Sequence, residues 1–196
     1  MESQAAMSER PIDAALIAAC QRGDREAFRL LFEAYKDRVY SVALYFFGGD
    51  AAQAADVTQQ VFLKLFTKIA QFRAEAEFTT WLYRLTTNAC VDEQRKRRRL
   101  TQFDEAAAPA RVQRGTAQEE RHARREVAER VQTAVAELKP KLRVAILLKY
   151  FEGLSYEEMA AVLGCSKGTV ASRLNRGHKA LARRLGHLRG VLMQGD

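Results

Sequence analysis

The sequence predicts an all-α fold in which two small helical domains are joined by a flexible linker, with a helix-turn-helix in the second domain. Apolar residues recur every three or four positions through most of the chain, and no convincing period-two strand is present. This pattern fails between residues 101 and 118. Within residues 152–181, two short periodic segments meet at a glycine, as the two helices of a helix-turn-helix do.

The first predicted domain, residues 1–100, contains about four helices. Leu16, Ile17 and Cys20 mark the first helix, and the second ends at the turn residues 48–50. The Ala-rich segment AAQAAD leads into the third helix. The fourth begins between residues 76 and 80 and continues through the basic run RKRRR at residues 95–99.

Residues 101–118 are the predicted linker, because they contain Pro109, Gly115 and few large apolar side chains that could be buried. The second predicted domain, residues 119–196, resumes helical periodicity at Val127. Pro140 suits the first turn of a helix, where its missing N–H has no intrahelical partner. The apolar helix that follows, LRVAILLKYF, is expected to be central to a second core.

Composition narrows the possible functions. The formal net charge of +8 favours a polyanionic partner. The three cysteines form no CxxC pair, so neither a disulfide framework nor a zinc site is indicated, and we expect no metal and no cofactor. No segment has the pattern of a signal peptide or a membrane span, so we expect a reducing cytoplasm and no direct membrane insertion.

The stretch 152–181 contains the local signals of two capped helices. Ser155 and Glu158 form a predicted capping box, Gly164 supplies the turn, and Ser166 is the predicted N-cap of the second helix. One face of the second helix is expected to point inward. It carries Val170, Leu174, His178 and Leu181.

The opposite face of that second helix carries small polar and basic residues. Arginine can pair with the major-groove edge of guanine, serine and threonine suit base edges or phosphates, and lysine suits phosphates. A charged face is more often only solvated, but the capped short helix, the glycine turn and the basic N-terminal end together favour DNA binding. The predicted contact residues are Lys167, Thr169, Ser172, Arg173, Arg176 and Lys179.

Three segments, in order, resemble bacterial sigma factors of the extracytoplasmic-function type. SYEEMAAVLGCSKGTVASRLNRGHKAL at residues 155–181 is similar to the second domain of that family. DVTQQVFLKLF at 56–66 resembles its polymerase-binding helix, and FTTWLYRLTTNACVDEQRKRRR at 78–99 resembles its promoter-melting helix. The resemblance implies a subunit that binds core RNA polymerase, reads the minus-35 element with its helix-turn-helix and opens the minus-10 element with its first domain.

The resemblance also implies a polymerase-binding face on residues 56–66. Its candidates are Asp56, Gln59, Gln60, Phe62 and Leu63, in which polar groups flank an apolar anchor as in a protein-protein hot spot. Phe62 taken alone is better explained as a core residue. Gln60 stands where the family often has glutamate, so the side chain at this position is neutral.

Strand opening needs a surface that receives an unstacked base and cations that hold the displaced strand. The loop 70–78 corresponds to the base-capturing loop of the family, and Trp81 alone would more often be packed core than a stacking surface. The basic run could simply complement the helix macrodipole, although five cations exceed what that effect requires. The candidates are Phe72, Arg73, Phe78, Trp81, Arg84, Asn88, Arg95, Lys96 and Arg98.

Other functional classes fit the sequence less well. Catalysis by the chain itself is not expected, since its three histidines lack metal-like spacing and no glycine-rich phosphate loop follows a strand. The main competitor is a stand-alone helix-turn-helix repressor or activator that binds an operator as a dimer, and binding to core polymerase would discriminate the two. His178 and Cys165 could form a sensor, but two residues without further ligands are better explained by packing. The family resemblance further implies an anti-sigma partner.

Overall fold

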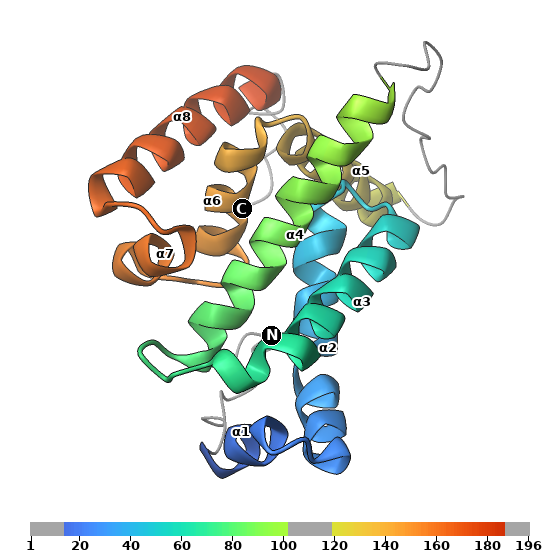
Figure 1. Ribbon diagram of the computed structural model, residues 1–196. Coiled ribbons are helices and arrows are strands. Elements are labelled where there is room, and N and C mark those ends of the chain that lie inside the picture. The colour runs from blue at the N-terminus through green and yellow to red at the C-terminus, as the bar shows by residue number, and fades with distance from the viewer. Residues whose placement is uncertain (1–13, 102–118, 187–196) are drawn as a thin grey trace.

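The computed structural model describes residues 14–101 and 119–186, and all the regular secondary structure within these ranges is helical (Figure 1). The N-terminal unit contains α1 (Ala14–Gln21), α2 (Arg25–Phe46), α3 (Ala51–Lys68), the 3-10 turn η1 (Ile69–Gln71) and α4 (Phe78–Thr101). The C-terminal unit contains α5 (Glu119–Ala136), α6 (Pro140–Tyr150), α7 (Tyr156–Leu163) and α8 (Lys167–Leu185). The predicted all-α fold is confirmed. Apart from Thr101, which ends α4, the predicted linker lies outside the described residues.

Short polar side chains and glycines set the helix ends of the N-terminal unit. Asp24 accepts hydrogen bonds from the N–H groups of Glu26 and Ala27 at the start of α2, at 2.9 and 3.1 Å. Gly48 and Gly49 follow the end of α2 with φ of +67° and +93°, a region that favours glycine, which confirms the predicted break. Helices α2, α3 and α4 then enclose a core that includes Leu31, Val57, Val61, Leu65 and Leu82.

The C-terminal unit is organised around α6. Pro140 is the first residue of this helix, as predicted from its missing N–H. All six residues from 143 to 148 are buried, so α6 is apolar on nearly every side and needs neighbours all round. Helix α8 covers one side of α6, while α2, α4, α5 and α7 also contact it.

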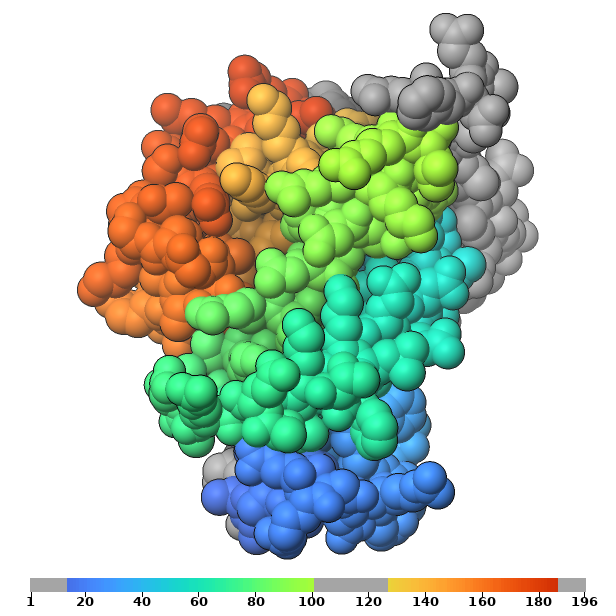
Figure 2. All heavy atoms as spheres, in the orientation of Figure 1, coloured from blue at the N-terminus to red at the C-terminus, as the bar shows by residue number. Residues whose placement is uncertain are grey.

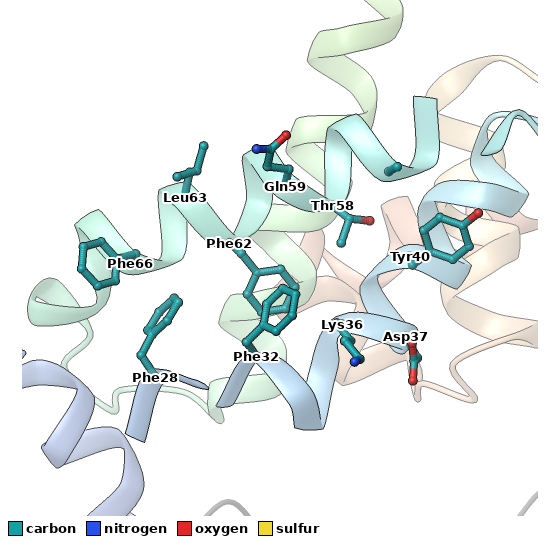
Figure 3. A pocket seen from close by; sticks show the side chains of 11 residues that line it. Phe28, Phe32, Lys36, Asp37, Tyr40, Thr58, Gln59, Phe62, Leu63 and Phe66 are labelled. Atoms are coloured by element: carbon teal, nitrogen blue, oxygen red, sulfur yellow. The ribbon is translucent and has the colours of Figure 1, made fainter. Parts of the chain in front are cut away.

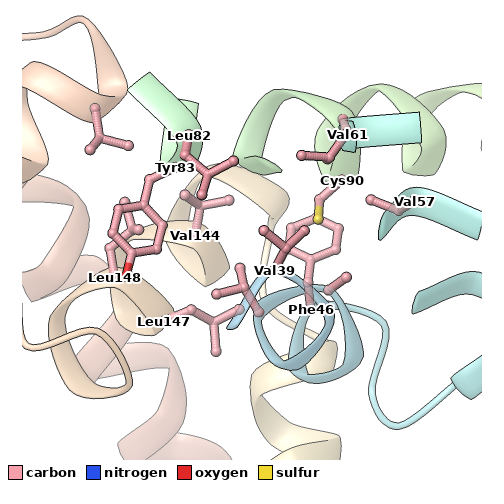
Figure 4. Close-up of a cluster of buried hydrophobic side chains, with 14 of the residues drawn as sticks. Val39, Phe46, Val57, Val61, Leu82, Tyr83, Cys90, Val144, Leu147 and Leu148 are labelled. Carbon is pink, nitrogen blue, oxygen red and sulfur yellow. The ribbon is translucent and has the colours of Figure 1, made fainter. Parts of the chain in front are cut away.

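The apolar core is continuous across both units, whereas the sequence predicted a separate second core. Figure 4 shows buried side chains from the two units packed together, and Figure 2 shows α4 lying between α3 and the C-terminal helices. The core is continuous because α6 is buried on nearly every side and α8 alone cannot cover it. The residues that meet here include Val39, Phe46, Tyr83 and Cys90 from the N-terminal unit and Val144, Leu147 and Leu148 from the C-terminal unit.

A buried arginine joins the carboxyl ends of two helices across this boundary. Arg143 is 4% exposed, and its guanidinium lies 4.7 Å from the centre of the Phe46 ring. It donates to the carbonyl of Phe46 at 2.5 Å, to that of Leu138 at 3.0 Å and to that of Ala136. Phe46 ends α2 and Ala136 ends α5, so the cation neutralises the negative ends of both helices.

A second polar contact lies around Glu152, just after α6. Its side chain is 7% exposed and accepts a hydrogen bond from Arg38 Nε at 2.7 Å and another from the hydroxyl of Tyr83. Arg38 belongs to α2 and Tyr83 to α4, so one carboxylate joins three helical segments from both units. Beside it, the ring centres of Tyr45 and Phe151 lie 4.1 Å apart across the same boundary.

Candidate DNA and polymerase interfaces

Helices α7 and α8 form the predicted helix-turn-helix, and its local signals are confirmed. Ser155 Oγ accepts from the N–H of Glu158 at 3.2 Å, and the Glu158 carboxylate accepts from the N–H of Ser155 at 2.7 Å. Gly164 ends α7 with φ of +58°, and Ser166 caps α8 by accepting from the N–H of Thr169 at 3.2 Å. The relative placement of the two helices therefore depends on four residues that are readable from the sequence.

The inward face of α8 differs from the prediction at one position. Val170 and Leu174 are buried and Leu181 is half-buried, but His178 is exposed and its Nε2 lies 2.8 Å from the hydroxyl of Tyr150. The adjacent residue, Gly177, takes the buried position that was predicted for His178. A Cβ at position 177 would lie 3.0 Å from Ile146 Cγ1, so the absence of a side chain lets α8 approach α6 closely.

Most of the predicted major-groove residues lie on the solvent side of α8. Lys167 Nζ is paired with Glu157 of α7 at 2.6 Å, and Arg176 donates from Nε to the carbonyl of Ser172 at 3.3 Å. Thr169 and Arg173 are half-buried, so they are less available than the pattern suggested. The exposed members of the predicted set are Lys167, Ser172, Arg176 and Lys179.

The loop before α4 and the first turn of that helix gather three aromatic rings. Phe72 lies 5.7 Å from Phe78 and 5.3 Å from Trp81, measured between ring centres. Phe78 is 5% exposed and also packs against Tyr35, whereas Phe72 and Trp81 are half-buried. Phe78 therefore supports the cluster, and the other two rings are the ones that an unstacked base could reach.

The same loop has two features that sequence reasoning missed. Gln21, at the end of α1, donates from Nε2 to the carbonyls of Phe72 and Ile69, at 2.8 and 3.1 Å. Ala74 has φ of +55°, which is uncommon for a residue with a side chain. No sequence pattern marks Gln21, because its partners are backbone atoms about fifty positions away. The bonds hold the loop at a fixed place beside the aromatic rings.

The polar candidates on α4 and in its loop are all exposed. Arg73 lies in the loop and Asn88 in mid-helix, while Arg84 donates from Nη2 to the carbonyl of Ala161 in α7. The basic run forms the last turns of α4, as predicted, and it contains Arg95, Lys96 and Arg98. Arg95 Nη1 lies 3.7 Å from Asp92 Oδ1, an exposed pair that contributes little to stability.

A groove between α2 and α3 contains part of the predicted polymerase face (Figure 3). Its volume is about 520 Å³, and Gln59, Phe62 and Leu63 are among its lining residues. Phe62 is 5% exposed, and its ring centre lies 4.7 Å from that of Phe32 in an edge-on contact. It therefore forms the floor of the groove, in agreement with the core role expected from the sequence. Leu63 is 59% exposed at the rim, whereas Asp56 and Gln60 lie outside the lining.

Aromatic residues that were not singled out from the sequence complete this groove. Phe66 is 54% exposed, and its ring lies edge-on 4.9 Å from that of Phe28. Phe66 follows Phe62 by four positions and Leu63 by three, so helical spacing could have placed it on the same face. Phe28 and Phe32 come from α2, and only the packing of α2 on α3 brings them to the groove.

Comparisons with known proteins identify the family. The profile of sigma-70 region 2 matches residues 31–100, and that of sigma-70 region 4 matches residues 128–181. The RNA polymerase sigma-H factor of Pseudomonas aeruginosa is 35% identical over 88% of this chain and 93% of its own. The ECF RNA polymerase sigma-E factor of Escherichia coli K12 is 34% identical over 89% of this chain and 95% of its own.

Solved structures agree with these relatives. CnrH, solved with the cytosolic domain of CnrY, matches with a TM-score of 0.64 and 26% identity over 88% of this chain and 96% of its own. The sigma factor RpoE of Bartonella quintana, solved with the anti-sigma factor NepR, has the same fold, with a TM-score of 0.62 over 81% of this chain and 96% of its own. The chain therefore belongs to the extracytoplasmic-function group of the sigma-70 family, the promoter-specific initiation factors that its sequence resembles.

Proposed function

We propose that this sigma factor binds core RNA polymerase through the groove between α2 and α3, reads an upstream promoter element with α8 and opens the downstream element beside α4. The observation that carries the proposal is the combination, on one chain, of a capped helix-turn-helix with an exposed cationic face and an aromatic cluster followed by a basic helix end. The first suits a major groove, and the second suits single-stranded DNA. Chemistry would be carried out by the polymerase, and the cytoplasm is the proposed location.

The polymerase-binding part rests on exposed apolar surface. Leu63 and Phe66 expose more than half of their surface at the groove rim, which is unusual for large apolar side chains unless a partner covers them. We expect Leu63→Asp with Phe66→Asp to weaken binding to core polymerase at least about 30-fold, the effect of losing a small hot spot. Leu30→Asp is the control, because Leu30 is 48% exposed on α2 but lies outside the groove lining. Equal binding by the groove variant and the control would remove the groove from the proposal.

The upstream contact is tested separately. Arg173→Ala with Arg176→Ala should abolish protection of the upstream element in footprints while leaving polymerase binding intact. Arg25→Ala with Arg29→Ala removes the same charge from α2 and should leave the footprint unchanged. Loss of polymerase binding in the α8 variant would show that the helix has been assigned the wrong role.

Strand opening has its own measurement. Trp81→Ala and Asn88→Ala should reduce permanganate reactivity of the downstream element while the closed complex still forms. Unchanged reactivity would contradict the assignment of the α4 face to melting.

The dimeric repressor alternative would replace the whole proposal if the purified chain failed to bind core polymerase.

An anti-sigma factor is a further proposed partner. CnrH and the Bartonella RpoE were each solved with a second protein, which in the RpoE complex is named as an anti-sigma factor. Co-purification with a protein that competes with core polymerase for this chain would support the same relation here.

A further inference from the structure

The turn before the aromatic loop is anchored by a side chain from a distant part of the sequence. Gln21, the last residue of α1, is half-buried, and its side-chain amide donates to the carbonyls of Phe72 at 2.8 Å and of Ile69 at 3.1 Å. The Ile69 carbonyl also accepts from the N–H of Phe72 at 3.0 Å, which closes η1. An amide nitrogen has two hydrogens to donate, so Gln21 can hold both ends of this turn at once.

The helix that carries Gln21 is itself fixed. Its neighbour Cys20 is 5% exposed, and in the turn that follows the N–H of Asp24 donates to the carbonyl of Ala19 at 3.1 Å. Asp24 then caps α2 with its side chain. Figure 1 shows α1 at the end of the molecule where α3 passes into α4, and α1 contacts both α2 and η1. The amide of Gln21 is thus presented by a rigid element, which positions a partner more precisely than a loop does.

The loop beyond this anchor is exposed and strained. Residues 73–77 are all exposed. Ala74 has φ of +55°, and a side chain in this conformation persists only where the surrounding structure imposes it. The next buried side chain is Phe78, which is 5% exposed and packs against Tyr35. The loop is therefore held between a backbone anchor at Phe72 and a buried ring at Phe78.

The anchored carbonyl belongs to a residue whose ring forms part of the candidate base-binding surface. The ring centre of Phe72 lies 5.3 Å from that of Trp81, and the two ring planes are inclined at 40°. Both side chains are half-buried, so each keeps some surface that a base could contact. With its carbonyl held by Gln21, Phe72 has little freedom to swing away from Trp81. A base that reached these rings would find them already ordered, which lowers the entropic cost of binding.

We propose that Gln21 is a positioning residue for strand opening, which fixes the Phe72 ring beside Trp81 before DNA arrives. The inference rests on the proposed function, since the placement of these rings matters only if an unstacked base binds them. Gln21 acts through the backbone of Phe72 and needs no contact with DNA. Preorganised stacking favours the open state, whereas polymerase binding and upstream recognition use other surfaces.

The free chain tests the anchor without polymerase or DNA. Trp81 is the only tryptophan, so acrylamide quenching of its fluorescence reports how well the Phe72 ring covers it. Gln21→Met keeps the length of the side chain without its donors, and Gln21→Glu replaces the donors by acceptors. We expect both substitutions to raise the quenching constant toward that of Phe72→Ala. Gln53→Met is the matched control, because the Gln53 amide bonds Asp50 at the far end of α3, and it should leave quenching unchanged.

Strand opening is then measured in the holoenzyme. Gln21→Met and Gln21→Glu should each lower permanganate reactivity of the downstream element about tenfold, the size expected for losing two hydrogen bonds of ordinary net strength. Affinity for core polymerase and protection of the upstream element should stay within about twofold of the original chain, as in Gln53→Met. If polymerase affinity fell as much as reactivity in both Gln21 variants, a general defect of the domain would replace the positioning role.

A double variant separates positioning from general stability. If Gln21 acts through the Phe72 ring, adding Gln21→Met to Phe72→Ala should lower reactivity by less than about twofold further. The same loss as in the original background would contradict the inference.

Failure of the inference and failure of the proposed function give different results. Reduced permanganate reactivity in Trp81→Ala, with unchanged quenching in both Gln21 variants, would overturn the inference alone. Raised quenching in the Gln21 variants, with unchanged reactivity in Trp81→Ala, would overturn the melting role of the α4 face and the inference with it.

Discussion

Ser155 shows how much one side chain contributes to the position of the helix-turn-helix. Hydrogen bonds from Ser155 hold the pKa of Glu158 below the usual glutamate value of 4.5. The side chain of Ser155 has the larger effect and its backbone the smaller one. A carboxyl with a lowered folded pKa stabilises the fold above its unfolded-state pKa, and this contribution is lost as the pH falls through the folded value. The capping box is therefore a source of acid sensitivity in α7.

Removing the cap should be measurable as a loss of stability. Ser155→Ala is expected to lower the free energy of unfolding by about 1 kcal/mol at pH 7, measured by urea denaturation. The difference from the original chain should shrink as the pH falls below about 4.5 and through the lowered folded pKa of Glu158. Ser41→Ala, at an exposed position within α2, is the control and should change stability by less than about 0.5 kcal/mol. A loss that did not depend on pH would show that Glu158 plays no part.

The three thiols should differ in reactivity. Burial raises the pKa of Cys90 to about 12 and also raises the pKa of Cys20, so both remain protonated at pH 8. Cys165 is half-buried at the turn after α7. An aromatic disulfide reagent at pH 8 should therefore titrate one thiol quickly in the native chain and three in denaturant. Cys165→Ser should remove the fast phase, and rapid reaction of Cys90 in the native chain would contradict its burial.

At the scale of elements, the contact of α8 with α6 depends on a missing side chain. Gly177 is buried in the middle of α8, where alanine would favour the helix by roughly 0.5–1 kcal/mol. However, its Cβ would lie 3.0 and 3.1 Å from two carbons of Ile146, which is itself 3% exposed and has little room to move. Packing and helix propensity therefore oppose each other at this position.

Two glycines of the same helix allow the packing effect to be isolated. Gly168→Ala, where the nearest atom outside the backbone is Ser166 Oγ at 3.9 Å, should raise the melting temperature. Gly177→Ala should lower it, because overpacking typically costs about 1–3 kcal/mol. Equal stabilisation by the two substitutions would mean that α6 can retreat from α8 without loss.

At the scale of the whole molecule, Arg143 connects the two units. Burial lowers its pKa to about 10, and the guanidinium therefore remains protonated at neutral pH. Its hydrogen bonds reach carbonyls of both units. Because the apolar core is also continuous, the described parts of the two units should unfold in one cooperative transition.

Replacing this arginine should weaken that coupling. Arg143→Met leaves buried carbonyls without donors and is expected to lower the free energy of unfolding by about 2–4 kcal/mol. It should also broaden or split the calorimetric transition. Lys141→Met, at an exposed position of the same helix, is the control and should keep a single transition near the original temperature. An unchanged single transition in Arg143→Met would show that the apolar contacts alone join the units.

Much of the candidate site could be predicted because it depends on local rules. The capping box at Ser155, the glycine turn at Gly164 and the cap at Ser166 involve residues at most three positions apart, and all three are confirmed. The break at Gly48 and the start of α6 at Pro140 follow equally local steric reasons. His178 was misplaced because helical spacing alone cannot distinguish two adjacent positions at the edge of an apolar face.

The sequence by itself determined the helices, their ends, the helix-turn-helix and the family, since each depends on residues close together in the chain or on motifs in a fixed order. Tertiary structure alone decided that the two units share a core, that Phe28 and Phe32 complete the groove, and that Glu152 meets Arg38 and Tyr83. The physical reason is that periodicity shows which face of a helix avoids water but not which distant surface covers it. That choice is made by shape and by the pairing of buried charges, and both exist only once the chain has folded.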